Sequence, residues 1–214
     1  MIFFDMDDTI CESRQIISPK MKKKLLSLKE PFVVATGAEK KRLIKQMDGV
    51  PCIMLAQNGN DAPDWKNTLT ENEKVEVINH LHKVAKFTGC PIDKQTLHDR
   101  GCQMSYSFTG HDADIKWKRK FDPKKEYREN VLKNVPFKSK TMLVRVAGTT
   151  CFDYNKKGNL KGDNIKRYIK LHRLDKNDCI FYGDNFDKGG NDESVLKVMP
   201  CVKVSGPDEL YKLI

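Results

Sequence analysis

Short apolar runs alternate with amphipathic segments at both ends of the chain. The apolar runs are MIFFD, PFVVATG and PCIMLAQNG in the first third, and DCIFYGD and CVKVSG in the last. Such runs are typical of strands buried on both faces of a parallel sheet. The segments with helical character are SPKMKKKLLSL, AEKKRLIKQM, KGDNIKRYIKLHRL, NDESVLKVM and PDELYKLI. This alternation predicts an α/β fold with a doubly wound parallel sheet.

The middle of the chain has a different pattern. TENEKVEVINHLHKVAKFTG reads as one long amphipathic helix, with Val77, Leu81 and Val84 on its inner face. GCQMSYSFTG reads as a strand, DPKKEYRENVLKNV as a helix and KTMLVRVAGTTCFDYN as a hairpin of strands. We therefore expect an inserted α+β domain over residues 62–157, between the two halves of a core domain formed by residues 1–61 and 158–214.

Charge is concentrated in this middle segment. The 214-residue chain has a net charge of +10, and residues 62–157 hold 19 basic and 12 acidic residues. An excess of cations favours an anionic partner, although a solvated lysine-rich surface explains it equally well. The basic stretch IKWKRKF has the composition of a nucleic-acid patch. Because no nucleic-acid-binding fold accompanies it, we expect no nucleic-acid partner.

Cysteine usage and hydropathy bear on the compartment. The seven cysteines are odd in number, and their spacing matches neither a disulfide framework nor a zinc site. Several lie in apolar runs, as expected of small buried side chains in a reducing compartment. No apolar run approaches the roughly 20 residues that span a bilayer. We therefore expect a cytoplasmic protein without a membrane partner.

Polar side chains follow four of the expected strands. They are Asp5 with Asp7, Thr36, Asn58 and Asp184. In open parallel sheets, ligands bind beyond the carboxyl ends of the strands. Carboxylates that converge there repel one another unless a cation neutralises them, and oxygen ligands suit Mg²⁺. The stretch DMDDT, taken alone, could simply be the polar beginning of a loop. A second expected strand also ends in an acidic residue, in GD, and this argues against that interpretation.

Four stretches, in order, resemble the motifs of the haloacid dehalogenase superfamily of phosphotransferases. They are FDMDDT, VVATG, KGNLKGDNI and FYGDNFDKGGND. The resemblance implies that Asp5 is a nucleophile that forms an aspartyl-phosphate and that Asp7 is the general acid/base. It also implies that Thr36 binds a phosphoryl oxygen and that Lys161 offsets the charge of Asp5 and the transferring group.

The same resemblance implies a metal site and a larger, C2-type cap. Mg²⁺ would contact the carboxylate of Asp5, the main-chain carbonyl of Asp7 and the carboxylate of Asp184. Asn191 and Asp192 would orient the waters of the metal or the motif lysine. Asp8 stands where a glycine is common in the first motif.

Within the superfamily, the chain is similar to the eukaryotic-type phosphomannomutases over nearly its whole length. The similar stretches are DDTICESRQIIS, DRGCQMSYSFTGH, GTTCFDYNKKGNLKG and GDNFDKGGND. The resemblance implies that Arg14 and Arg100 contact the substrate and that Asp153 contacts a sugar hydroxyl. Asn58, at the end of the third strand, is expected among the substrate-binding residues. The implied reaction interconverts mannose 6-phosphate and mannose 1-phosphate, and the implied assembly is a homodimer formed through the cap.

Two departures from that pattern keep a second reaction open. His111 and Lys118 stand where those enzymes carry cap arginines that hold the distal phosphate. Lysine lacks the bidentate fork of arginine, and histidine is only partly charged near neutral pH. A sugar-phosphate phosphatase, which needs only one phosphate site and a water, is therefore the alternative. A phosphate-binding protein without turnover is a third reading, which the four intact motifs disfavour.

Overall fold

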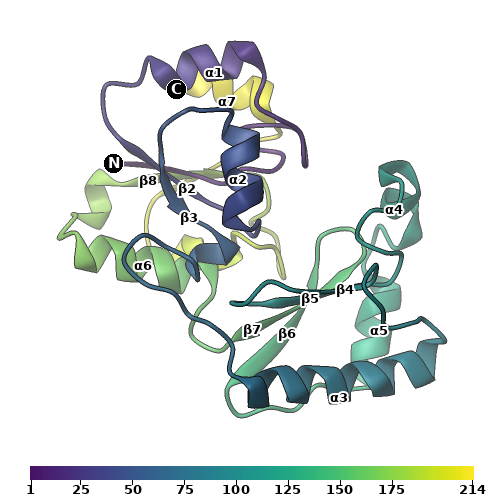
Figure 1. Cartoon of the computed structure of the whole chain (residues 1–214). Coiled ribbons are helices and arrows are strands. Elements are labelled where there is room, and N and C mark those ends of the chain that lie inside the picture. The colour runs from purple at the N-terminus through teal and green to yellow at the C-terminus, as the bar shows by residue number, and fades with distance from the viewer. The chain divides into compact units, whose positions relative to one another are not determined.

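The computed structural model describes residues 1–214, and the chain divides into two compact units. The first unit consists of Met1–Asn67 and Gly158–Ile214, and the second consists of Thr68–Lys157. The elements of both units are labelled in Figure 1. No helix of the structure has both the length and the apolar character needed to cross a bilayer.

The first unit is built on a parallel sheet with the strand order β3-β2-β1-β8-β9. Every adjacent pair is parallel, and the central strand β1 pairs with β2 on one edge and with β8 on the other. This order confirms the predicted doubly wound sheet. The strands are β1 (Ile2–Phe4), β2 (Phe32–Ala35), β3 (Ile53–Leu55), β8 (Ile180–Gly183) and β9 (Cys201–Lys203).

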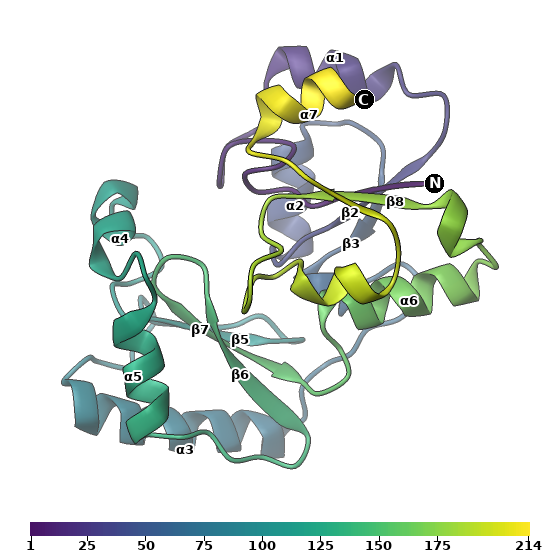
Figure 2. The ribbon, with the colours of Figure 1, turned by 180° about the vertical axis from the view of Figure 1, so that it is seen from behind.

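Helices cover both faces of this sheet. Successive residues of β1 point to opposite faces, so that Phe4 packs into one apolar cluster and Phe3 into the other. On the face of Phe4 lie α1 (Pro19–Leu26), α2 (Lys40–Met47) and α7 (Pro207–Leu213). On the face of Phe3 lie α6 (Lys161–Leu171) and the 3₁₀ turn Glu193–Lys197 (Figure 2). Burial on both faces is the reason that these strands read as continuous apolar runs.

Local sequence sets the bounds of these helices. The Ser18 side chain accepts a hydrogen bond from the backbone N–H of Met21 at 3.1 Å, and Pro19 begins α1 as predicted. The segment NDESVLKVM differs from the prediction, because it forms the 3₁₀ turn Glu193–Lys197 instead of an α-helix. Only a few residues separate this turn from β9, and they include Pro200, which cannot donate a helical hydrogen bond.

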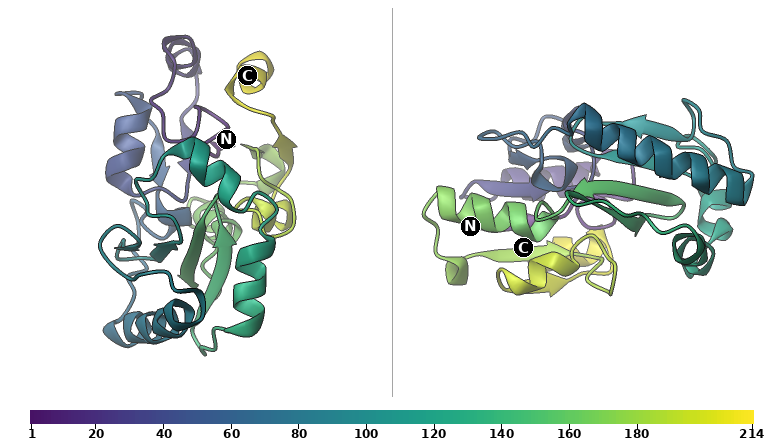
Figure 3. Two further views of the ribbon diagram at one scale, coloured as in Figure 1. Left: turned by 90° about the vertical axis from the view of Figure 1, so that its right-hand side faces the viewer. Right: turned by 90° about the horizontal axis from the view of Figure 1, so that it is seen from below.

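The second unit is an antiparallel sheet with the strand order β4-β5-β7-β6. Two helices pack on one of its faces (Figure 3), where Val77, Leu81 and Val84 are fully buried as their spacing predicted. The strands are β4 (Leu97–Asp99), β5 (Met104–Ser107), β6 (Met142–Ala147) and β7 (Cys151–Lys156). The two packed helices are α3 (Glu71–Thr88) and α5 (Glu126–Asn134), and a shorter helix, α4, covers Ile115–Phe121.

The first division between the units follows Asn67, later in the chain than the predicted position 62. Side-chain contacts explain the difference. Trp65 is buried and donates its Nε1–H to the carbonyl of Gly59 at 2.8 Å, and the Asn67 amide donates to Asn60 Oδ1 at 3.0 Å. These contacts hold the connecting segment to the first unit. The second division falls between Lys157 and Gly158.

Candidate active site

Three carboxylates meet at the carboxyl edge of the parallel sheet. Asp5 directly follows β1, Asp184 directly follows β8, and Asp192 lies in the loop that comes next. The backbone N–H of Asp5 donates to the Tyr182 carbonyl at 2.8 Å, which places the ends of the two neighbouring strands side by side. One oxygen from each carboxylate lies within 4.8 Å of the others.

A single buried ammonium group joins two of these carboxylates. Lys161 is the first residue of α6, and its side chain is fully buried. Its Nζ lies 2.7 Å from Asp5 Oδ1 and 2.6 Å from Asp192 Oδ1. The structure therefore brings together the residues expected from the first, third and fourth motifs, although they are far apart in the sequence.

Burial and the charges within the cluster together shift the pKa values of its groups. Burial raises the pKa of Asp5 well above its ordinary value; Lys161 opposes this rise, and Asp192 and Asp184 add to it. Burial likewise raises the pKa of Asp184 to about 6, with Asp192 adding to the effect. Burial disfavours the charged form of Lys161, but the carboxylates of Asp192 and Asp5 outweigh it and raise the pKa of the lysine.

The donor set fits a hard divalent cation. All the groups that converge here are oxygen donors, and the residue types and their number suit Mg²⁺ better than a thiophilic metal. One ammonium among three carboxylates leaves negative charge uncompensated. A divalent cation would offset the repulsion between the carboxylates, which adds to the effect of burial in raising the pKa of Asp5 and Asp184.

Two glycines permit the close approach of the segments that form the cluster. A Cβ atom on Gly183 would lie 2.5 Å from Asp192 Oδ2, and one on Gly162 would lie 2.2 Å from the carbonyl oxygen of Ser194. Both distances are shorter than real contacts of a Cβ atom. The backbone N–H of Gly162 instead donates to Ser194 Oγ at 2.9 Å. Close packing therefore explains why glycine occupies positions 162 and 183, next to Lys161 and Asp184.

Thr36 and Asn58 lie at the ends of the next two strands. Thr36 follows β2 and is buried, and its Oγ1 accepts the backbone N–H of Ala38 at 3.1 Å. The backbone N–H of Asn58 donates to the Thr36 carbonyl at 2.7 Å. Asn191, beside Asp192, is half-buried. These positions are compatible with the roles expected from the sequence, which stay predictions.

The Asp7 carboxylate is held by groups outside the carboxylate cluster. Its Oδ2 accepts from Arg42 Nη2 at 2.7 Å, and its Oδ1 accepts from Gln46 Nε2 at 3.0 Å and from the backbone N–H of Arg14 at 2.8 Å. The Arg14 side chain is exposed. Sequence reasoning missed Arg42 and Gln46. The available signal was two polar residues four positions apart on α2, the helix after the second motif, where a single helix face presents both.

The backbone conformation of Asp8 explains why a glycine is common at this position of the first motif. Its φ is 59°, in the left-handed region that favours glycine and that aspartate tolerates better than most residues. The Asp8 side chain accepts the backbone N–H of Ser13 at 3.1 Å, a local contact that supports the turn. The substitution is therefore accommodated by the turn and requires no new function.

Three of the predicted cap residues form one connected group in the second unit. The Lys118 ammonium donates to the backbone carbonyl of His111, and both side chains are buried. His111 Nε2 lies 3.0 Å from the carbonyl oxygen of Ser105, whose Oγ donates to Asp153 Oδ1 at 2.6 Å. Ser105 was not expected from the sequence, because its role depends on the pairing of β5 with β7.

The surroundings of His111 favour its neutral form. Burial lowers the pKa of His111 to about 4; the hydrogen bond to Ser105 opposes this, while His98, Arg100 and Lys118 add to it. The ring of His98 stacks on that of His111 with 3.8 Å between centroids. Arg100 follows β4 and is half-buried. His111 was expected to help bind a phosphate, but its side chain therefore carries no positive charge at neutral pH.

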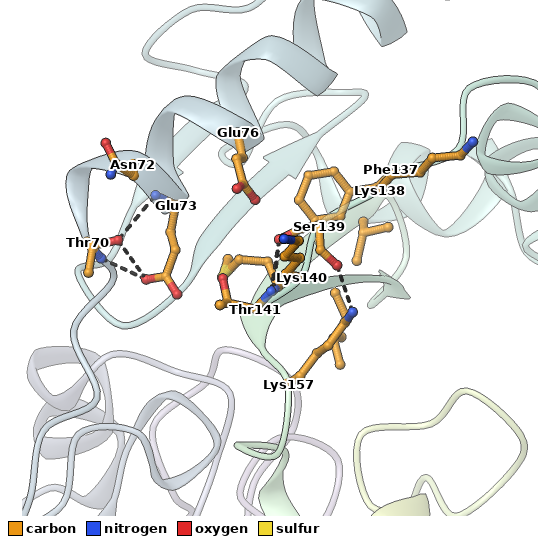
Figure 4. A pocket seen from close by; sticks show the side chains of 13 residues that line it. Thr70, Asn72, Glu73, Glu76, Phe137, Lys138, Ser139, Lys140, Thr141 and Lys157 are labelled. Carbon is orange, nitrogen blue, oxygen red and sulfur yellow. Dashed lines mark hydrogen bonds between the residues drawn. The ribbon is translucent and has the colours of Figure 1, made fainter.

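A separate groove of about 1020 Å³ lies in the second unit, between the first turns of α3 and the start of β6 (Figure 4). Some of its polar groups bind one another: Glu73 accepts the backbone N–H of Thr70 at 2.8 Å, and Lys157 donates to the Ser139 carbonyl at 2.7 Å. None of the residues expected in the active site lines the groove. We therefore assign it no part in the chemistry.

Similarity to known proteins agrees with this geometry. The chain is 25% identical to a phosphomannomutase from Encephalitozoon cuniculi (strain GB-M1), over 100% of this chain and 91% of that protein. The fold is similar to that of SMU.1108c from Streptococcus mutans UA159, with a TM-score of 0.71, 14% identity and coverage of 99% of this chain and 96% of that one.

Two further solved structures share the fold. The subclass IIB sugar phosphatase BT4131 has a TM-score of 0.63 and 15% identity, over 99% of this chain and 96% of that one. The IMP-nucleotidase of Plasmodium falciparum, truncated at its N-terminus and bound to IMP, has a TM-score of 0.67 and 13% identity. The match covers 99% of the present chain but only 66% of the nucleotidase chain.

The family model of haloacid dehalogenase-like hydrolases matches residues 2–142, which is more than half of the chain. The matched range begins with β1 and the first aspartate motif, includes β4 and β5 of the antiparallel sheet and ends at the first residue of β6. On this match, with the shared fold, the chain belongs to the haloacid dehalogenase-like hydrolase family.

Proposed function

We propose that this chain transfers the phosphoryl group of a hexose phosphate through Asp5, in a phosphomannomutase-like reaction. The observation that carries the proposal is the contact of the buried Lys161 ammonium with Asp5, beside Asp184 and Asp192. A carboxylate at the mouth of a parallel sheet, with a fixed cation beside it, is suited to in-line attack on phosphorus.

The proposed first step forms a bond between an Asp5 carboxylate oxygen and phosphorus. The bond between phosphorus and the bridging sugar oxygen breaks, and the proton of Asp7 passes to that oxygen. Lys161 stays charged throughout and stabilises the negative charge of the transferring group. In the second step, the phosphoryl group passes to another hydroxyl of the sugar, and Asp7 takes up the proton of that hydroxyl.

Mg²⁺ is the cofactor that this proposal implies. Asp5, Asp184 and the main-chain carbonyl of Asp7 would hold it, and Asn191 and Asp192 would support its surroundings. When bound, the ion supplies positive charge to the phosphoryl oxygens. We expect Mg²⁺ to raise the melting temperature of the wild-type chain, and Asp184→Asn to reduce that increase.

The substrate class rests on the whole-chain similarity to a phosphomannomutase. By resemblance to such enzymes, Arg14, Arg100 and Asp153 would contact the sugar phosphate, and the first two offer a guanidinium for phosphate. The sugar-phosphate phosphatase is the second candidate function. It is favoured by the neutral His111 and by Lys118, whose ammonium binds a backbone carbonyl, because both weaken the grip on a distal phosphate.

Phosphorus NMR with mannose 1-phosphate separates these reactions. With Mg²⁺ and a hexose bisphosphate primer, we expect mannose 6-phosphate to accumulate faster than inorganic phosphate. Faster release of inorganic phosphate would reject the mutase reaction in favour of the phosphatase. Asp5→Asn should abolish both signals, because an amide cannot replace the nucleophile. If Asp5→Asn and wild type turn over the substrate equally, the proposed function is wrong.

A further inference from the structure

Three hydrogen-bond donors hold the carboxylate of Asp7, and none of them was expected from the sequence motifs. Oδ1 accepts two hydrogen bonds, from Gln46 Nε2 and from the backbone N–H of Arg14, at 3.0 Å and 2.8 Å. Oδ2 accepts one, from Arg42 Nη2 at 2.7 Å. Each carboxylate oxygen has two lone pairs, so Oδ1 is saturated and Oδ2 keeps one lone pair.

The two side-chain donors come from one face of one helix. Arg42 and Gln46 lie four residues apart on α2, which places them in adjacent turns on the same side. The guanidinium and carboxylate are only partly buried, with exposed fractions of 32% and 25%. Opposite charges held at 2.7 Å in this setting give a directional contact, because the guanidinium presents its N–H groups in a fixed fork.

Gln46 is the more rigid of the two. Its side chain is 1% exposed, and its Nε2 also faces Cys11 Sγ at 3.3 Å and the carbonyl oxygen of Gln15 at 3.0 Å. Three acceptors around one nitrogen fix the orientation of the amide, because the flipped amide would aim its oxygen at all three. The backbone carbonyl of Gln46 also accepts the N–H of Ile17 at 2.9 Å. The end of α2 and the segment after the first motif are therefore joined at several points.

We infer that Arg42 and Gln46 are positioning residues that fix the orientation of the Asp7 carboxyl group for proton transfer to the leaving oxygen. The inference rests on the proposed function, in which Asp7 is the general acid/base. In this step Oδ2 is the oxygen with room for the transferred proton, because it accepts one hydrogen bond while Oδ1 accepts two. As the bond between phosphorus and oxygen breaks, this proton completes the sugar hydroxyl, and Asp7 becomes a carboxylate that the same three donors stabilise.

Dependence on the leaving group tests the inference. A sugar alkoxide needs a proton as it leaves, whereas p-nitrophenolate is stable without one. We expect Arg42→Ala and Gln46→Ala each to lower kcat on mannose 1-phosphate by about tenfold or more, within the range of general acid catalysis. Turnover of p-nitrophenyl phosphate should change by less than about threefold, and KM for mannose 1-phosphate should change little. Arg42→Lys keeps the charge without the fork and should restore part of the activity.

Lys45→Ala is the matched control, because it removes an exposed cation from the same helix. It should leave both activities at the wild-type level. Far-UV circular dichroism and melting temperature show whether each variant folds. Equal losses on the two substrates in folded variants, or a faster reaction on mannose 1-phosphate, would overturn the inference. A wild-type chain that turns over neither substrate would instead refute the proposed function.

Discussion

Lys161 is the residue on which the carboxylate cluster depends. Its ammonium is fully buried and contacts Asp5 and Asp192, whose carboxylates are buried as well. A buried ion pair adds little net stability compared with an apolar alternative, but the loss of one partner leaves the other charges unpaired in a region of low polarity. The side chain therefore links the stability of the first unit to its chemistry.

We expect Lys161→Ala to lower the free energy of unfolding by about 3–5 kcal/mol, because two buried carboxylates lose their cation. Turnover of mannose 1-phosphate should fall to background in the same variant. Urea denaturation followed by circular dichroism measures the first effect, and phosphorus NMR measures the second. Lys166→Ala, an exposed position on the same helix, is the control and should match wild type. A fully stable Lys161→Ala variant would contradict this account of the cluster.

His111 provides a prediction on pH. Its pKa is about 4 in the folded chain and close to 6.5 when unfolded, so the unfolded state takes up its proton first as the pH falls. His111 therefore contributes stability that is present above about pH 6.5 and is lost toward pH 4. Asp184 acts in the opposite sense, because its pKa of about 6 lets the folded chain hold a proton that the unfolded chain releases.

The measurement is therefore a difference in slope between variants. His111→Phe keeps an aromatic ring beside His98 but cannot be protonated. The urea midpoint of this variant should fall less than that of wild type between pH 7 and pH 5. His82 is exposed, and His82→Gln should keep the wild-type slope. Identical slopes for wild type and His111→Phe would show that His111 is protonated equally in both states.

Among the elements, α5 and the hairpin of β6 and β7 are joined by one buried arginine. Arg128 is fully buried, and its Nε donates to Asp122 Oδ2 at 2.8 Å. Its Nη1 faces three backbone carbonyls at the hairpin turn, those of Ala147, Gly148 and Cys151, at 2.8, 3.2 and 3.3 Å. This contact fixes the hairpin turn to the start of the helix.

We expect Arg128→Met to destabilise the second unit by about 3–5 kcal/mol, because Asp122 would be left as an unpaired buried carboxylate. The double variant Arg128→Met with Asp122→Leu should recover much of that loss, since it removes both charges. Urea denaturation of the full chain, followed by circular dichroism, tests both expectations. If the double variant is less stable than the single one, the buried pair is not the cause.

The sequence predicted those elements whose residues repeat at a clear period. The apolar runs before Asp5 and Asp184 predicted central strands, and the spacing in α3 predicted its buried face. The elements α4 and β4 were not predicted, because the first is a lysine-rich seven-residue helix and the second is a three-residue strand with a single apolar residue, Leu97. Their form depends on partners in β5 and in the aromatic cluster around Phe121, which no local pattern reveals.

The candidate site was predictable to the extent that fixed spacing encodes it. The motifs placed Asp5, Lys161 and Asp184 at strand and helix ends, and the geometry brings them together. The contact of Asp7 with Arg42 could not be predicted, because it depends on how α2 lies against the turn after β1. The same limit applied to Ser105, which reaches Asp153 only through the register of two strands.

At the scale of the whole molecule, charge is the property that bears on substrate capture. The chain carries a net charge of +10, and residues 62–157 hold 19 basic against 12 acidic residues. Positive potential attracts sugar phosphates over distances of about a Debye length, roughly 10 Å at 0.1 M salt. We expect kcat/KM for mannose 1-phosphate to fall several-fold as sodium chloride rises, with kcat nearly constant. A loss confined to kcat would contradict electrostatic capture.

The position of β1 has a consequence for how the chain is made. This strand lies between β2 and β8, yet β8 begins only at Ile180, after the whole of Thr68–Lys157. On the ribosome, the inserted unit is complete before the first strand acquires its second neighbour. The apolar edge of Ile2–Phe4 therefore stays uncovered during most of synthesis, and nascent chains that stop before residue 180 should require chaperones to remain in solution.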